Sequence, residues 1–193
     1  MQLQKAIKKR RSIRSYKNKK PDWRDIIDCI DSTRYSPYAG GYYSLKFLIL
    51  DNEKDIQLIA ELSDQDFIKE APYVVIFVSD TSITKHVYPE RGETYSKQQA
   101  GAAIQNFLLS AVEKGLSSCW IGHFNKEKIT KEFKIKGDIE AILPIGYAKE
   151  EPKRKEIEPS LFNRTFFHEF GNKRMERPRA IHPFDPKPWG GKL

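Results

Sequence analysis

The sequence predicts one domain in which helices and strands alternate, and three observations support this expectation. Apolar residues recur along 96–114, from Ala100 to Val112, at the spacing of one helix face. Gly115 then stops this helix, and the apolar run 116–121 has the length of a buried strand. The apolar runs 43–50 and 73–79 indicate two further strands. A length of 193 residues suits a single core better than two independent ones.

The other elements follow in chain order. A short helix is expected around Leu3, a second helix after Pro21-Asp22, and a third over 53–62. Residues 80–95 lack clear periodicity, and 88–93 within them are expected to form an exposed loop. Ser96 and Gln99 have the spacing of a capping box, which places the start of the central helix at Ser96. Asn125 is expected to cap another short helix, and 139–147 the last core strand.

Composition limits the classes of protein. No apolar run approaches the ~20 residues that a membrane helix needs, and no secretory signal is visible. The two cysteines lie on apolar faces, which favours reduced core thiols and a cytoplasmic protein. The net charge of +8 invites a nucleic-acid interpretation, but the charge is spread along the chain and no nucleic-acid-binding motif accompanies it. Nucleic-acid binding is therefore a minor alternative.

Several common active-site patterns are absent from the sequence. The four histidines do not have the spacing of a metal site, so no metal is expected. No G-x-G-x-x-G run follows a strand, and no nucleophile-elbow motif is present. Neither a Rossmann dinucleotide site nor a hydrolase triad is predicted.

One short segment has the chemistry of a site for an anionic ligand, and a second has the composition of a turn. In Arg11-Ser12-Ile13-Arg14, guanidinium groups and a hydroxyl can converge on a phosphate while Ile13 anchors the segment. The turn-rich run 36–41, SPYAGG, lies between a helix and a strand, and its glycines allow a close approach of the backbone to a ligand. An ordinary charged surface and an ordinary loop are the alternatives for these two segments.

Four motifs in order resemble the FMN-dependent nitroreductase family. RRSIR at 10–14 resembles the family's phosphate-binding R-R-S-x-R motif, and 37–41 resembles its P-S-A-G segment. QDFIKEAP at 65–72 resembles the family's Q-x-[FW]-[IV]-x-x-A-P element, and GLSSCWIG at 115–122 its central strand. The sequence departs from the family at Tyr38, Tyr43 and Gln99, where Ser, Gln and Asp are usual. The resemblance covers about residues 3–160.

The resemblance implies a set of residues that bind FMN. The phosphate would be held by Arg10, Arg11, Ser12 and Arg14, with Arg154 or Lys155 in support. The flavin ring would lie against Pro37, Tyr38, Ala39, Gly40, Gln65, Ile121, Gly122 and His123. A main-chain amide of Gly122 or His123 would face flavin N5, and no catalytic side chain is expected.

The resemblance also implies the architecture and the activity. The expected fold is α+β, with a mixed, mostly antiparallel sheet flanked by helices, in an intertwined homodimer. Residues 1–160 would form the FMN-binding domain and 161–193 a C-terminal extension. The expected enzyme passes a hydride from NAD(P)H through flavin N5 to a small oxidised acceptor such as a nitroaromatic or a quinone. A flavin-binding relative without reductase activity and a basic nucleic-acid-binding protein are the alternatives.

Overall fold

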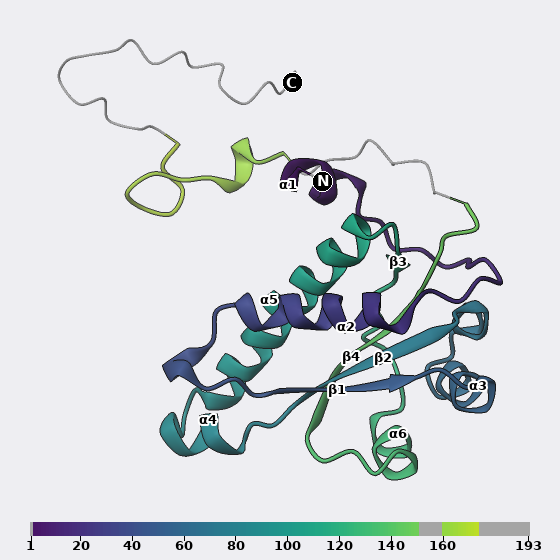
Figure 1. Cartoon of the computed structure of the whole chain (residues 1–193). Coiled ribbons are helices and arrows are strands. Elements are labelled where there is room, and N and C mark those ends of the chain that lie inside the picture. The colour runs from purple at the N-terminus through teal and green to yellow at the C-terminus, as the bar shows by residue number, and fades with distance from the viewer. Residues whose placement is uncertain (1, 151–159, 174–193) are drawn as a thin grey trace. The chain divides into compact units, whose positions relative to one another are not determined.

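The computed structural model describes residues 2–150 and 160–173, which belong to two compact units. The first unit contains a four-stranded sheet with helices around it (Figure 1). Its α-helices are α1 (Leu3–Lys9), α2 (Trp23–Asp31), α3 (Glu53–Leu62), α4 (Ser82–Val87), α5 (Gly92–Glu113) and α6 (Lys126–Glu132). Its strands are β1 (Leu45–Leu50), β2 (Tyr73–Ser79), β3 (Ser117–Ser118) and β4 (Asp138–Gly146). Its 3-10 turns are η1 (Ser32–Tyr35), η2 (Ala39–Gly41) and η3 (Asp66–Glu70).

The sheet has the strand order β1-β2-β4-β3, and all three pairs of neighbouring strands are antiparallel. Leu45 pairs with Ser79 at the start of β1, and Tyr73 pairs with Ile145 at the start of β2. Within the described residues the parallel pairing is limited to one isolated bridge, between Ser12 and Ser118. The predicted α+β architecture with a mostly antiparallel sheet is confirmed.

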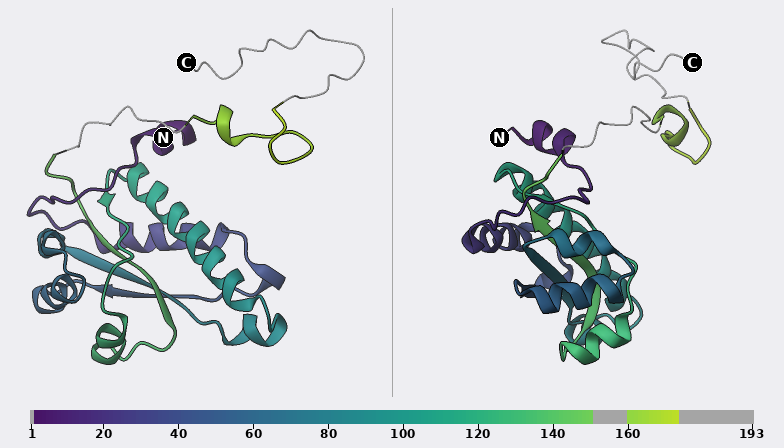
Figure 2. Two further views of the ribbon diagram at one scale, coloured as in Figure 1. Left: turned by 180° about the vertical axis from the view of Figure 1, so that it is seen from behind. Right: turned by 90° about the vertical axis from the view of Figure 1, so that its right-hand side faces the viewer.

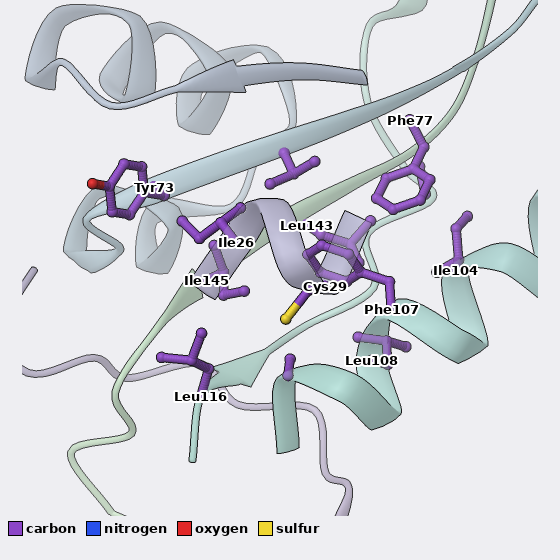
Figure 3. Close-up of a cluster of buried hydrophobic side chains, with 13 residues drawn as sticks. Ile26, Cys29, Tyr73, Phe77, Ile104, Phe107, Leu108, Leu116, Leu143 and Ile145 are labelled. Carbon is purple, nitrogen blue, oxygen red and sulfur yellow. The ribbon is translucent and has the colours of Figure 1, made fainter. Parts of the chain in front are cut away.

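Both faces of the sheet are covered, so its central strands are apolar on both sides. All seven residues of β2 are buried, and they alternate between two cores. Figure 3 shows one core, where Ile26 of α2 and Phe107 of α5 lie over Phe77 and Leu143. Residues from α3 and α6 pack on the opposite face, and the side view in Figure 2 shows α2 and α6 on opposite sides of the sheet.

The central helix begins earlier than the sequence predicts. Helix α5 starts at Gly92, so Ser96 is inside the helix and its hydroxyl lies 2.7 Å from the Thr84 hydroxyl. Gly92 packs directly on the preceding helix α4, because an added Cβ would lie 2.2 Å from the Thr84 carbonyl oxygen. The capping box predicted for Ser96 and Gln99 is therefore wrong. The predicted loop 88–93 is shorter, because its last two residues already belong to α5, and helix α4 precedes it.

The described part of the second unit, residues 160–173, is organised around one lysine. The Lys173 ammonium group donates hydrogen bonds to the carbonyl oxygens of Phe162 and Thr165, at 2.6 and 3.2 Å. It also lies 3.9 Å from the centre of the Phe166 ring, a distance typical of a cation–π contact. The predicted division of the chain at residue 160 stays a prediction, because 151–159 are outside the described residues.

Candidate cofactor-binding site

The basic segment 10–14 leaves α1 and runs beside β3. Ser12 forms a parallel bridge with Ser118, and the Ile13 amide donates to the Ser118 carbonyl oxygen at 3.1 Å. Side chains alternate in such an extended segment, and Ile13 is directed into a small core with Tyr16 and Ala71. The alternation places Arg10, Ser12 and Arg14 on the other side of the segment.

Arg10, Ser12 and Arg14 lie on the side of the segment nearest the buried thiol of Cys119, because Ser12 pairs with Ser118. Burial raises the pKa of the Cys119 thiol, while the Arg14 charge, a Ser12 hydrogen bond and the Arg10 charge act in the opposite direction. The Arg14 guanidinium also lies over the Phe67 ring, 5.8 Å from its centre. Two cations and a hydroxyl group therefore share one face, and no ion pair occupies either arginine within 2–150 and 160–173.

Arg11 lies apart from this cluster. Its guanidinium donates to the Arg10 carbonyl oxygen at 2.6 Å. Together with Lys9 and Ile13 it lines a small cavity of about 130 Å³ at the end of α5, beside Gly115. The structure thus separates Arg11 from the three other residues predicted to hold the phosphate. The supporting residues Arg154 and Lys155 lie outside the described residues.

The predicted ring-binding residues 65 and 121–123 lie close in the chain to Phe67 and Cys119, which contact the basic residues. Gln65 precedes η3, half buried, and its side chain has no hydrogen-bond partner in the described part of the chain. Ile121 exchanges two backbone hydrogen bonds of 3.0 Å with Ile142, but the strand pairing ends there. Gly122 and His123 are exposed, and among the described residues their amides donate to no acceptor. Two main-chain donors, three and four residues after Cys119, are consequently open in the described part of the chain.

The loop 37–41 has its conformation set by glycine. Gly40 and Gly41 have φ values of 61° and 76°, in the left-handed region that favours glycine. The Tyr38 and Tyr43 rings meet edge to face with their centres 5.7 Å apart. A Cβ added to Gly40 would lie 2.8 Å from the Tyr88 hydroxyl oxygen, so little room is left beside the loop. Pro37 and Tyr38 are exposed, and Ala39 is half-buried.

This loop and the basic segment lie at opposite ends of α5. The loop neighbours Tyr88, and the backbone amide and hydroxyl of Ser44 donate to Gln99 Oε1 at 3.1 and 2.6 Å. The basic segment lies beside Gly115 and Ser118, after the last residue of α5. Helix α5 has 22 residues and so is about 33 Å long. Within one chain, residues 37–40 do not join the cluster formed by the other predicted site residues (Figure 1).

The donor set on the basic face fits a phosphate group. Guanidinium groups and hydroxyls are strong donors to phosphate oxygens, and here two guanidinium groups have no carboxylate partner in the described residues. Ser118 pairs through its backbone with Ser12, and its buried hydroxyl has no hydrogen-bond partner in the described part of the chain. Among all the described residues, no group of His, Cys, Asp and Glu side chains could hold a metal ion.

Sequence reasoning missed two residues that hold the basic segment in place. The Tyr16 hydroxyl and the Glu70 carboxylate both bind its backbone, as described below. Tyr16 and Glu70 are 54 positions apart in the sequence, so no local pattern reports their contact. None of the described helices is long and apolar enough to cross a membrane.

Two known proteins are similar to this chain over most of their length. A protein of Methanothermobacter thermautotrophicus described as an NADH dehydrogenase or NAD(P)H nitroreductase is 27% identical over 164 residues, which cover 81% of this chain and 83% of that protein. The iodotyrosine deiodinase of Thermotoga neapolitana is 26% identical over 176 residues, covering 77% of this chain and 89% of the relative.

The fold is also that of a solved structure. An FMN-dependent nitroreductase of Clostridium difficile R20291 superimposes with a TM-score of 0.72 at 23% identity, over 86% of this chain and 98% of the other. The sequence model described as the nitroreductase family matches residues 7–65 and 55–147, which is most of the chain. These matches confirm the resemblance seen in the motifs, and the chain belongs to the nitroreductase family.

Proposed function

We propose that the protein binds FMN on the basic face and passes a hydride from NAD(P)H to a small oxidised acceptor, such as a nitroaromatic or a quinone. The observation that carries the proposal is the pairing of Ser12 with Ser118, which gathers Arg10, Ser12 and Arg14 at Cys119, and the open amides of Gly122 and His123 follow in the same segment. Membership of the nitroreductase family confirms the predicted class, an NAD(P)H oxidoreductase with FMN as cofactor. The acceptor and the residue roles are the proposed part.

The residues of the cluster divide the work of binding. Arg10, Ser12 and Arg14 donate charge-assisted hydrogen bonds to the phosphate, each of which contributes about 1.5–3 kcal/mol. Gln65 and the amide of Gly122 or His123 face the polar edge of the ring. FMN itself supplies the hydride chemistry when it is bound. The main-chain amides are fixed by the bridge at Ile121, so little rearrangement is needed as charge develops near them.

We further propose that the complete site requires a second copy of the chain. Residues 37–41 lie at the opposite end of α5 from Arg10, at a separation that a mononucleotide does not span. A two-fold dimer would bring this loop of one protomer to the basic face of its partner and form two equivalent sites. Exposed apolar residues of α1, among them Leu3 and Ile7, are available for such an interface.

The alternative functions are less well supported. A basic arm that binds nucleic acid is free to follow a backbone, whereas here Ile13 is buried and the segment is paired with β3. The relationship to an iodotyrosine deiodinase favours including halogenated aromatic compounds among the acceptors that are tested.

The proposal is tested with the purified protein and added FMN under anaerobic conditions. Flavin absorbance that co-elutes with the protein, and that is bleached by NADH or NADPH, is the expected result. Reoxidation by nitroaromatic, quinone and halogenated aromatic acceptors then ranks the substrates. Bound flavin that neither nicotinamide reduces would contradict the reductase and favour the non-reducing relative. Failure to bind FMN would contradict the site itself.

A further inference from the structure

We propose that Tyr16 and Glu70 are positioning residues, which hold the phosphate-binding segment at the correct depth and orientation without touching the phosphate. The inference rests on the proposed function of Arg10, Ser12 and Arg14. It concerns residues outside the cluster, and it explains why an extended segment between a short helix and a loop keeps one conformation.

Tyr16 anchors the middle of the segment to the sheet. Its side chain is 2% exposed, and its hydroxyl oxygen lies 2.8 Å from the Ile13 carbonyl oxygen and 3.2 Å from that of Pro144. Ile13 is the residue between Ser12 and Arg14, so this contact fixes the backbone from which both project. Burial raises the pKa of the Tyr16 hydroxyl, which therefore remains a donor throughout the physiological range.

The Tyr16 ring is held by packing, in addition to the hydrogen bonds of its hydroxyl. Tyr16 forms an isolated bridge with Ala148, just after β4. Gly146 faces the ring, and an added Cβ there would lie 3.2 Å from Tyr16 Cδ1 and 2.7 Å from Pro72 Cδ. A side chain at residue 146 would force Pro72 to shift, because its Cβ would lie less than 3.0 Å from Pro72 Cδ, and it would also press on the Tyr16 ring.

Glu70 joins the segment to two other parts of the site. Its Oε2 accepts from the Tyr16 amide at 3.1 Å and from the Ser15 hydroxyl at 3.2 Å. Lys149 follows β4 by three residues, and its ammonium group lies 3.6 Å from the same oxygen. Glu70 is also the last residue of η3, whose Phe67 lies below Arg14. One carboxylate thus connects the basic segment with the elements after Gln65 and after β4.

These contacts give the two residues a selective effect on the cofactor. They restrain the donors for the phosphate, while the donors predicted for the ring, Gly122 and His123, are restrained separately by the Ile121 bridge. Loss of the restraint is expected to weaken binding of FMN and to leave binding of riboflavin, which lacks the phosphate, nearly unchanged. A general loss of stability would weaken both ligands alike.

The experiment measures dissociation constants of FMN and riboflavin for the wild type and for Tyr16→Phe, by quenching of flavin fluorescence. Tyr16→Phe keeps the ring and removes one hydrogen bond, so FMN affinity is expected to fall roughly 3- to 10-fold. Riboflavin affinity is expected to change by less than about 2-fold. Tyr43→Phe is the matched control, because it removes a hydroxyl that lies 2.6 Å from Thr33 Oγ1, far along the chain from the basic segment. Its ratio of FMN to riboflavin affinity should equal that of the wild type.

A parallel fall of both affinities in Tyr16→Phe, or no fall in either, would overturn the inference. Glu70→Gln provides a second variant with the same expected selectivity, and hydrogen exchange of the Ile13 amide provides a readout without flavin. Exchange at Ile13 should become faster in both variants and stay unchanged in Tyr43→Phe. Failure of the proposed function is visible separately: a wild type that binds riboflavin as tightly as FMN has no phosphate site, whatever the variants do.

Discussion

The two segments predicted to contact the flavin are built in opposite ways. The basic segment 10–14 is paired with β3, its Ile13 carbonyl oxygen accepts from the Tyr16 hydroxyl, and the Tyr16 amide just after it donates to the Glu70 carboxylate. The loop 37–41 has one internal backbone hydrogen bond, from the Tyr42 amide to the Ala39 carbonyl oxygen, and otherwise depends on glycines with positive φ and on tyrosine ring contacts. The first segment is held by long-range contacts, and the second by its own conformational preferences.

The difference matches the chemistry expected of each segment. Charged donors act on a phosphate through directional bonds, and an error in their placement weakens every bond at once. A loop that approaches a flat ring through its backbone needs space and the right backbone angles more than a fixed network. If the loop binds the ligand of a partner subunit, it must also reach its final position during assembly of the dimer.

The largest effect should come from removing the charges of the basic segment. Arg10→Ala combined with Arg14→Ala removes two charge-assisted donors, and FMN affinity should fall on the order of 10²- to 10⁴-fold. Riboflavin affinity should change little. Arg11→Ala is the control, because it also removes one positive charge but at a side chain that lines the separate cavity beside Lys9. An Arg11 variant as defective as the double variant would show that the alternation of the segment does not separate these side chains in the complex.

A smaller effect is expected in the loop, and it should not discriminate between ligands. Gly40→Ala places a side chain in the left-handed region at a cost of about 1–2 kcal/mol, and its Cβ would approach the Tyr88 hydroxyl. Affinities for FMN and riboflavin should therefore fall together, by roughly 5- to 30-fold. Gly101→Ala in α5 is the control, since its Cβ would meet nothing within 4 Å. A selective loss of FMN binding in Gly40→Ala would break the distinction drawn between the segments.

The Glu70 contact should make the basic segment sensitive to acid. Hydrogen bonding from the Tyr16 amide lowers the pKa of Glu70, with the Lys149 charge and Ser15 acting in the same direction. A carboxyl with a lowered folded-state pKa stabilises the fold above its ordinary value, about 4.3, and loses that contribution as pH falls through the lowered value.

Denaturant unfolding of the apoprotein measures this contribution. At pH 7 the wild type should exceed Glu70→Gln in unfolding free energy by less than about 1 kcal/mol, because the carboxylate is solvent-exposed. The difference should shrink below pH 4 and vanish in stronger acid. A difference that grows as the pH falls would contradict the assigned direction of the pKa shift.

The smallest effect is expected for the His123 side chain. We propose that residue 123 acts through its amide, which His123→Ala retains, so the rate of flavin reduction by NAD(P)H should change by less than about 2-fold. Rapid mixing under anaerobic conditions measures that rate. Loss of reduction with flavin still bound would show that the imidazole takes part in the reaction.

Elements that depend on local pattern were predictable from the sequence. Helix α3 and strand β2 have the predicted bounds, and Asn125 caps α6 by accepting from the Lys128 amide. The start of α5 was not predictable, because Ser96 satisfies a hydroxyl of α4 and Gln99 binds Ser44, 55 residues away. Polar residues that usually cap helices were here used for tertiary contacts.

The candidate site shows the same division. The basic cluster was visible in the sequence as RRSIR, and period-two alternation would have separated Arg11 from its neighbours. Motif spacing also pointed to Gly122 and Gln65, and their role in binding stays a prediction. The contributions of Tyr16 and Glu70 were not visible, because they arise where the segment meets β4 and η3, and no local pattern reports a contact over such a sequence distance.

The tight space at Gly146 has a consequence for the cell. A methyl group at this position would press on Pro72 and the Tyr16 ring, so a Gly146→Ala allele should encode a folded protein that retains its cofactor poorly. Occupancy of such a protein depends on the ratio of free ligand to dissociation constant. A cell with an ample supply of riboflavin would then show little defect, and the same cell with a low supply of riboflavin would lose the activity. An inherited dependence on riboflavin supply would trace to a residue that never meets the flavin.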